Sequence, residues 1–244
     1  MIRPPRSGGS ATSGLVHSFH LAELPWASAA RALVRPPSAE TTPGLRHAEC
    51  MAMMRLGSST VSPARLQLGR FAMFAEWDDA AALERFLSHN QLGRQLSGGW
   101  HVRMKFLRRY GQIAALSDLP QRASRWDPAE PVVAVTLARL KLPELPRFLR
   151  WGKPVERLVA NHPGATFATA AIRPPRTFST FSIWKTVREM TEMVHGHSDV
   201  PEPHTHAVAM AEQKRQDFHT ESAFMRFRPL SEHGTWQGRH LLPS

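Results

Sequence analysis

The feature that most constrains this chain of 244 residues is an internal repeat. The pattern Phe-x-x-Phe-x-x-Trp begins at Phe71 and begins again at Phe178, 107 positions later. Two further pairs of segments match in the same order, namely 16–24 with 132–140 and Met104-Lys105-Phe106 with Met225-Arg226-Phe227. One matching segment can arise by chance, but three in the same order rarely do. The chain is therefore expected to consist of two halves with the same design.

Apolar periodicity and turn residues predict the elements of the first half. Strands are expected at 16–24, 45–56, 71–77 and 100–110, and helices at 26–34 and 80–97. Asp78 and Asp79 precede the second helix, where their carboxylates can accept hydrogen bonds from its free N–H groups. Gly98 and Gly99 end that helix.

The second half repeats this order. Strands are expected at 132–140, 165–172, 177–184 and 223–229, and helices at 145–161, 187–195 and 206–220. Gly152 and Pro154 predict an interruption of the first of these helices, and 196–203 separates the other two.

Each half therefore has the order β-α-β-β-α-β, which is a ferredoxin-like unit. We expect an α+β fold in which tandem ferredoxin-like repeats form an architecture like a dimeric α/β barrel, because each sheet must cover its second face. A cavity for an apolar ligand or a cofactor is expected on the helix side of a sheet or between the sheets. The expected division is a disordered tail at 1–13, a first repeat at 14–116, a linker at 117–131 and a second repeat at 132–244.

Composition places the chain among globular proteins and excludes several classes. Hydrophobic residues make up 42% and charged residues 21%, and no apolar run is long enough to span a bilayer. Cys50 is the single cysteine, which excludes an intramolecular disulfide, and its methionine-rich surroundings predict a buried, inert thiol. The basic start at Arg3 and Arg6 lacks the apolar region of a secretory signal. We therefore expect a cytoplasmic protein.

The net charge of +11 does not by itself indicate nucleic-acid binding. The basic residues are scattered, whereas a nucleic-acid site gathers them in a stripe with aromatic residues between them. One cluster, 103–109, contains three arginines and a lysine, and we expect it to be a solvated face. No nucleic-acid partner is expected, while a basic surface leaves peripheral association with an anionic membrane open.

Common cofactor and nucleophile motifs are absent from the sequence. It contains no Gly-x-Gly-x-x-Gly after a strand, no phosphate-binding loop with Gly-Lys-Ser or Gly-Lys-Thr, and no Gly-x-Ser-x-Gly turn. A built-in nicotinamide or flavin domain and a serine hydrolase are thus disfavoured.

Four motifs of the second half stand together in the sequence. They are 177–184 (TFSTFSIW), His206-Ala207 at a helix start, 224–228 (FMRFR) and Gly234-Thr235-Trp236-x-Gly238. In this combination the chain resembles the spheroidene monooxygenase family of carotenoid-oxygenating enzymes. The similarity runs through most of 131–238 and is weaker over 15–111. It implies a barrel like the dimeric α/β barrels, O₂-dependent oxygenation of an apolar polyene, and a haem cofactor.

The chain departs from this family at three places. Lys185-Thr186 follows Trp184 where the family has a Pro-Asp helix cap, 196–204 is an apparent insertion, and 49–53 is only loosely similar. These differences leave the substrate open.

Four histidines lie close together in the second half: His195, His197, His204 and His206. His206 matches the helix-opening histidine of the family, and the resemblance implies that it binds the haem iron through a neutral imidazole nitrogen. The other three are expected to be polar loop residues. An alternative is a metal site built from His197, His204 and His206 with Asp199 or Glu202.

An oxygenase also needs a hydrogen-bond donor beside bound O₂. The candidates are His20, Arg46, Arg139 and Arg226, and the sequence does not rank them. An arginine stays protonated and can also pair with a haem propionate. His17 and His20 are three positions apart on one strand and should point to opposite faces.

Three functions remain open from the sequence. The first is a haem-dependent monooxygenase that acts on an apolar, carotenoid-like small molecule with O₂ as co-substrate and an external electron donor. The second is a cofactor-free barrel oxygenase, and the third is a non-catalytic protein that binds an apolar ligand. A monomer and a homo-oligomer are both compatible with two fused units.

Overall fold

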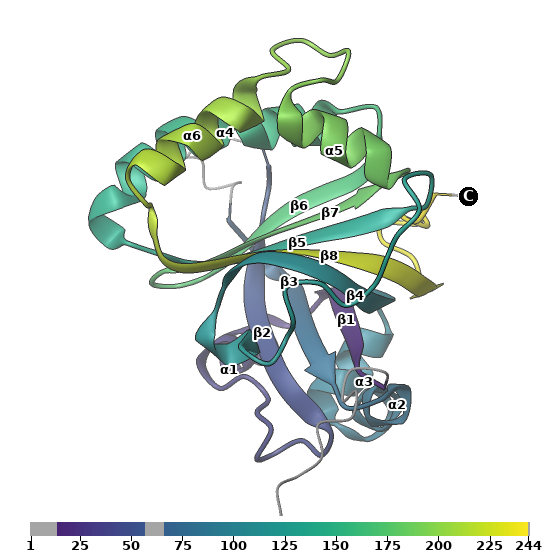
Figure 1. Cartoon of the computed structure of the whole chain (residues 1–244). Helices are drawn as coiled ribbons and strands as arrows, with labels where there is room; N and C mark the ends of the chain where they lie inside the picture. The colour runs from purple at the N-terminus through teal and green to yellow at the C-terminus, as the bar shows by residue number, and fades with distance from the viewer. Residues whose placement is uncertain (1–13, 57–65, 244) are drawn as a thin grey trace, which may run out of the picture.

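A single closed barrel organises the molecule (Figure 1). The computed structural model describes residues 14–56 and 66–243, so the expected tail at 1–13 lies outside the described residues. The described strands follow the order β1-β3-β2-β6-β7-β5-β8-β4 around the barrel, and neighbouring strands are antiparallel. The expectation of a mixed α+β fold with an antiparallel sheet is confirmed.

The first half contributes four strands and three helices among its described residues. These are β1 (Val16–Glu23), α1 (Trp26–Val34), β2 (Leu45–Met54), β3 (Leu66–Trp77), α2 (Ala80–His89), α3 (Gln91–Ser97) and β4 (Trp100–Gln112). Asp79 caps α2 as expected, because its side chain accepts a hydrogen bond from the N–H of Ala82 at 2.7 Å. The prediction of one helix over 80–97 is wrong. Asn90 ends α2 and caps α3 by accepting from the N–H groups of Leu92 and Gly93.

The second half repeats the order with different details. Its elements are β5 (Val132–Leu140), α4 (Leu145–Asn161), β6 (Ala165–Arg173), β7 (Thr177–Trp184), α5 (Val187–His195), α6 (Thr205–Arg215) and β8 (His219–His233). The predicted interruption of the first helix is wrong, since α4 continues through Pro154 while packing on β6 and α6. The last helix ends earlier than predicted because Gln216 is extended, and β8 is correspondingly longer.

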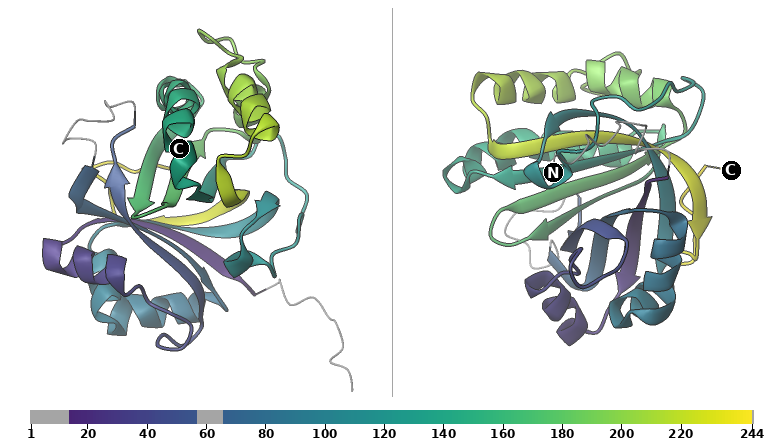
Figure 2. Two further views of the ribbon diagram at one scale, coloured as in Figure 1. Left: turned by 90° about the vertical axis from the view of Figure 1, so that its left-hand side faces the viewer. Right: turned by 60° about the horizontal axis from the view of Figure 1, so that its bottom comes forward.

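The two halves meet along two seams of unequal length. The pairing of β4 with β8 runs from His101 opposite His233 to Gln112 opposite Ser222. The pairing of β2 with β6 is short and joins 52–54 to 170–172. Figure 2 shows the helices of each half on opposite sides of the barrel. Within 14–56 and 66–243, no helix is both long and apolar enough to cross a bilayer.

Large apolar side chains fill the interior of the barrel. Phe19 of β1 stacks on Phe181 of β7 with ring centroids 3.9 Å apart, and Trp100 packs edge-on against Phe181. Phe74 and Phe227 pack beside them. Of the two places expected for a cavity, the space between the sheets is therefore occupied by packed core.

The outer face of the first half-sheet is also packed. Helices α1, α2 and α3 cover it through Phe71, Met73, Trp77 and Leu83, which are fully buried. Cys50 belongs to this cluster, and burial raises the pKa of its thiol. The thiol is thus inert at neutral pH, as expected from its apolar neighbours.

Candidate functional site

Two rows of mostly small side chains cross the outer face of the second half-sheet. Strand pairing places Ala170, Thr180, Thr136 and Phe224 in one row and Ala168, Ser182, Ala134 and Arg226 in the next, in the strand order β6, β7, β5, β8. All but Ala170 remain partly exposed. We call these eight residues the floor.

The helices of the second half leave the floor partly uncovered. One apolar cluster under α5 includes Trp184 and Met190, and another under the start of α4 includes Phe148 and Phe178. These clusters lie at opposite ends of the half-sheet, so most of the floor lies between them, while Ala134 packs against the cluster under α5. Helix α6 packs mainly on α4 and α5 rather than on strands (Figure 2). Seven of the eight floor residues are therefore only partly covered by the helices above them.

His206 lies in the first turn of α6 with a defined ring orientation. Its Nδ1 is 3.1 Å from the backbone oxygen of Val194 in α5. A carbonyl oxygen only accepts, so Nδ1 carries the proton and Nε2 carries the lone pair. Among the described residues, Nε2 has no hydrogen-bond partner. Burial lowers the pKa of His206 below its ordinary value, so the ring is neutral at pH 7.

Arg226 is the floor residue whose charge influences the pKa of His206. Its positive charge contributes to the lowered pKa of His206. The neighbours Met225 and Phe227 belong to the barrel core, so Arg226 lies on the outer face of the second half-sheet. Burial in turn lowers the pKa of Arg226, and its guanidinium lies 5.7 Å from the ring centroid of Tyr110. Of the four candidates for a donor, Arg226 is the one that the fold brings to the floor.

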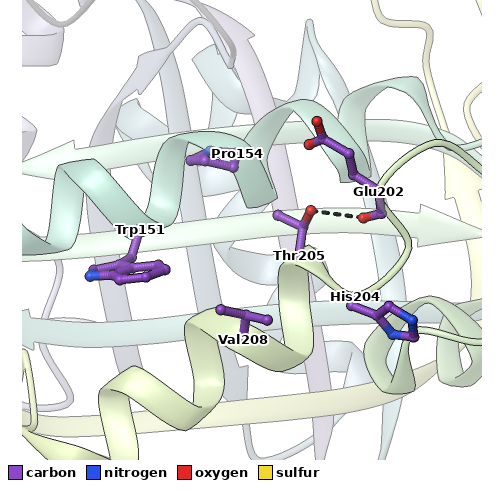
Figure 3. A pocket seen from close by; sticks show the side chains of 6 residues that line it. All are labelled: Trp151, Pro154, Glu202, His204, Thr205 and Val208. Carbon is purple, nitrogen blue, oxygen red and sulfur yellow. Dashed lines mark hydrogen bonds between the residues drawn. The ribbon is translucent and has the colours of Figure 1, made fainter.

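A groove of about 350 Å³ runs between α4 and α6 (Figure 3). It is lined by Trp151 and Pro154 of α4, by Thr205 and Val208 of α6, and by Glu202 and His204 just before α6. The Thr205 hydroxyl donates to the carbonyl of Glu202 at 2.7 Å, which closes the turn into the helix. His206 follows Thr205 and is turned by about 100° around the helix axis. The groove and the His206 ring therefore lie on different sides of α6.

His20 and Arg46 lie on the far side of the barrel from His206. The His20 ring is buried on the outer face of the first half-sheet, where Nε2 is 2.8 Å from the Ser18 hydroxyl. It stacks on His101 at 5.0 Å, and His101 stacks on His233 at 4.6 Å. Burial lowers the pKa of His20 well below its ordinary value. Arg46 pairs with Asp78 at 2.7 Å in the first half.

Arg139 is separated from the floor by the alternation of its strand. Its neighbour Ala138 lies on the outer face of the sheet with the floor residues. Arg139, the next residue along the strand, therefore points to the inner face, at one end of the barrel. There it hydrogen-bonds to the Glu49 carboxylate and donates to the Thr177 hydroxyl at 3.0 Å.

One buried polar pair, formed by His17 and Glu76, was not predicted from the sequence. His17 is fully buried, points into the barrel near Phe74 and Phe227, and has Nε2 3.3 Å from a carboxylate oxygen of Glu76. His17 lies two positions before Phe19 on the same strand, so the two side chains share the inner face. This spacing is the signal that could have placed His17 inside the barrel. As expected, His17 and His20 point to opposite faces.

The alternative metal site is not assembled. In the part of the chain that the structure describes, no three histidine, cysteine, aspartate or glutamate side chains are arranged to hold a metal ion. The rings of His195 and His197 are 6.1 Å apart, and His204 lines the groove instead.

The fold and floor together define a closed α+β barrel with one partly open, helix-covered face. Among solved structures, an aldoxime dehydratase in complex with butyraldoxime shares this fold, with a TM-score of 0.52 over 96% of this chain and 86% of that chain. Sequence identity is 10%, so this likeness concerns the fold alone.

Two curated proteins are similar in sequence. Spheroidene monooxygenase of Rhodobacter capsulatus is 30% identical over 127 residues, which cover 52% of this chain and 50% of that protein. Spheroidene monooxygenase of Rubrivivax gelatinosus is 26% identical over 210 residues, or 81% of this chain and 73% of that protein. The match thus spans half the length of the Rhodobacter relative. No family model matches the chain. Both relatives are named monooxygenases, in agreement with the class of enzyme expected from the sequence.

Proposed function

We propose that this chain is an O₂-dependent monooxygenase that oxidises an apolar, carotenoid-like small molecule in the space between the floor and α4, α5 and α6. Two similar proteins that are named spheroidene monooxygenase support the class of reaction. We further propose that the halves are tandem ferredoxin-like repeats, at 14–116 and 132–244, arranged like the subunits of a dimeric α/β barrel. The shared order of elements in the two halves supports this division.

The orientation of His206 is the observation that carries the proposal. A histidine that binds a metal usually donates its second ring N–H to a carbonyl or carboxylate, which fixes the ring and leaves one nitrogen free. His206 has this arrangement, with Nδ1 bonded to Val194 and a neutral ring. The composition of the floor supports haem in a second respect, since its Ala, Ser and Thr side chains are small and most of them are partly exposed. In this proposal His206 would hold the haem iron, and the guanidinium of Arg226 would pair with a carboxylate of the group or offer hydrogen-bond donors beside it.

Each residue then has a defined task. Haem, when bound, supplies the binding and activation of O₂, with electrons from an external donor. Arg226 remains protonated and provides hydrogen-bond donors beside the floor.

The test is the visible absorption spectrum of the protein titrated with haem. We expect a Soret band for the wild-type chain and for His204→Ala, a matched control on the groove. His206→Ala should bind haem at least about tenfold more weakly, because it removes the metal ligand. Equal binding by His206→Ala and His204→Ala would contradict the role of His206.

Product analysis distinguishes the other functions. The protein is incubated with a carotenoid, O₂ and a reductant, with and without haem. Oxygenated product that requires haem supports the proposal. Product formed equally without haem identifies a cofactor-free oxygenase. Carotenoid binding without product under either condition identifies a ligand-binding protein.

A further inference from the structure

A second cavity, of about 460 Å³, opens at the mouth of the barrel, away from the floor. It lies where the end of α1 meets the turn between β6 and β7, the end of β5 and the start of β8. Three arginines, Arg139, Arg173 and Arg176, line it together with Glu221 and the hydroxyl-bearing residues Thr177 and Thr220. Neither His206 nor the floor borders this cavity.

Glu49 organises the arginines from inside the barrel. Its side chain is only 1% exposed, and its two carboxylate oxygens accept from different guanidinium groups, those of Arg139 and Arg173. Burial opposes the charge of Glu49, but hydrogen bonds from His47 and Arg139 lower the pKa of the carboxyl. A charged carboxylate therefore holds two guanidinium groups side by side, and the Thr177 hydroxyl fixes Arg139 further. Such an arrangement is ordered before any ligand arrives.

Part of this positive charge is left unpaired. Arg173 uses one terminal nitrogen for Glu49, at 2.7 Å, and its other N–H groups have no partner among the described residues. The guanidinium of Arg176 has no ion pair in the same part of the chain. Three arginines face two carboxylates, Glu49 and Glu221, so the cavity keeps an excess positive charge. A guanidinium group can donate two parallel hydrogen bonds to the oxygens of a carboxylate or a phosphate group.

The rest of the wall is apolar. Leu33 and Val34 end α1 at the rim, and Pro174 and Pro175 form the opposite turn. Val34 is 79% exposed, so its side chain is accessible to a ligand at the rim. The cavity also exceeds the size of a phosphate group. Charge at the base and apolar side chains at the rim match a molecule with an oxyanion head on an apolar body.

We propose that this mouth cavity binds an amphiphile through its carboxylate or phosphate head, with Arg173 and Arg176 as the binding residues. The rim formed by Val34 and the two prolines contacts the first part of the apolar body. The same head-group chemistry occurs in a free alkyl phosphate or fatty acid and in an anionic lipid of a bilayer. The inference is independent of the function proposed for the floor.

The test measures binding of dodecyl phosphate, below its micellar concentration, by calorimetry on the full chain. The double variant Arg173→Gln/Arg176→Gln removes the free cation of Arg176 and one of the two arginines on Glu49, and keeps the Glu49–Arg139 pair. The matched control Arg157→Gln/Arg188→Gln removes the same charge from exposed positions on α4 and α5. We expect at least about a tenfold loss of affinity in the first variant and none in the control, since charge-assisted hydrogen bonds are lost.

Three further comparisons decide the outcome. Equal affinities of the two double variants would overturn the proposal, as would inorganic phosphate binding as tightly as dodecyl phosphate. Thermal unfolding of both variants confirms that each is folded. Co-sedimentation with phosphatidylglycerol vesicles, lost in Arg173→Gln/Arg176→Gln, identifies a lipid head group as the source. Binding of dodecyl phosphate without co-sedimentation identifies a free amphiphile.

Discussion

The outer faces of the two half-sheets have the same strand order but different side chains. Met73 of β3 and Thr180 of β7 occupy corresponding positions, 107 residues apart. Met73 lies between Cys50 and His20 and is fully buried, whereas Thr180 lies between Ala170 and Thr136 and is partly exposed. The strand order is shared, so side-chain size decides which face is fully packed and which stays partly exposed. The partly exposed face is the one on which the ligand site is proposed.

The largest difference is expected from truncating the two central residues. Met73→Ala should lower the free energy of unfolding by about 2–5 kcal/mol, because it leaves a cavity in a packed cluster. Thr180→Ala should change it by about 0.5 kcal/mol or less, since the position is partly exposed. Urea denaturation of both variants measures the difference. Equal destabilisation would show that the two faces are packed alike.

The packed face should also make the protein sensitive to acid. Burial lowers the pKa of His101 to about 4, below its ordinary value near 6.5, and the charges of His233 and Arg103 add to the shift. The neutral ring stabilises the fold fully above pH 6.5, and this contribution is lost as the pH falls towards 4. Between pH 7 and pH 5 the free energy of unfolding should fall by about 2 kcal/mol from this group.

Urea denaturation at the two pH values tests this dependence. His101→Gln should reduce it, because glutamine does not titrate in this range, while the buried His20 keeps its own contribution. His89→Gln, at an exposed position at the end of α2, should leave it unchanged. A pH dependence in His101→Gln as large as that of the wild type would assign the acid sensitivity to other groups.

The smallest effect is expected from making the open face resemble the packed one. Thr180→Met places the residue of the first half at the centre of the floor. Haem affinity should fall about tenfold, because the longer side chain fills the space, while thermal stability changes little. Thr41→Met, in the loop before β2, is the control and should leave haem binding intact. Unchanged haem affinity in Thr180→Met would remove the floor from the proposed site.

Most of the element order could be predicted because it depends on local signals. The strands at Val132–Leu140 and Thr177–Trp184 and the helix at Trp26–Val34 have the predicted bounds. The errors arose where a single residue or tertiary packing overrides periodicity. Asn90 acts as a cap inside an apolar helical pattern, and α4 tolerates Pro154 because its flanking turns are packed on β6 and α6.

The candidate site was less accessible from the sequence. The resemblance indicated His206, but the partner of its Nδ1 is a backbone carbonyl, which no side-chain pattern reveals. The four candidate donors could not be ranked because strand alternation gives a face only after register is known. Register places Arg226 on the floor and Arg139 at the barrel mouth. The Glu49–Arg173 contact joins residues 124 positions apart and had no sequence signal.

The restriction of the floor to one half has a consequence for stoichiometry. Two identical subunits related by a twofold axis would present two equivalent faces and take up two ligands per barrel. In the described chain the halves are covalently joined and chemically different, so this symmetry is broken at Met73 and Thr180. A titration of the proposed chamber should therefore saturate at a single equivalent per polypeptide, with no cooperativity between halves.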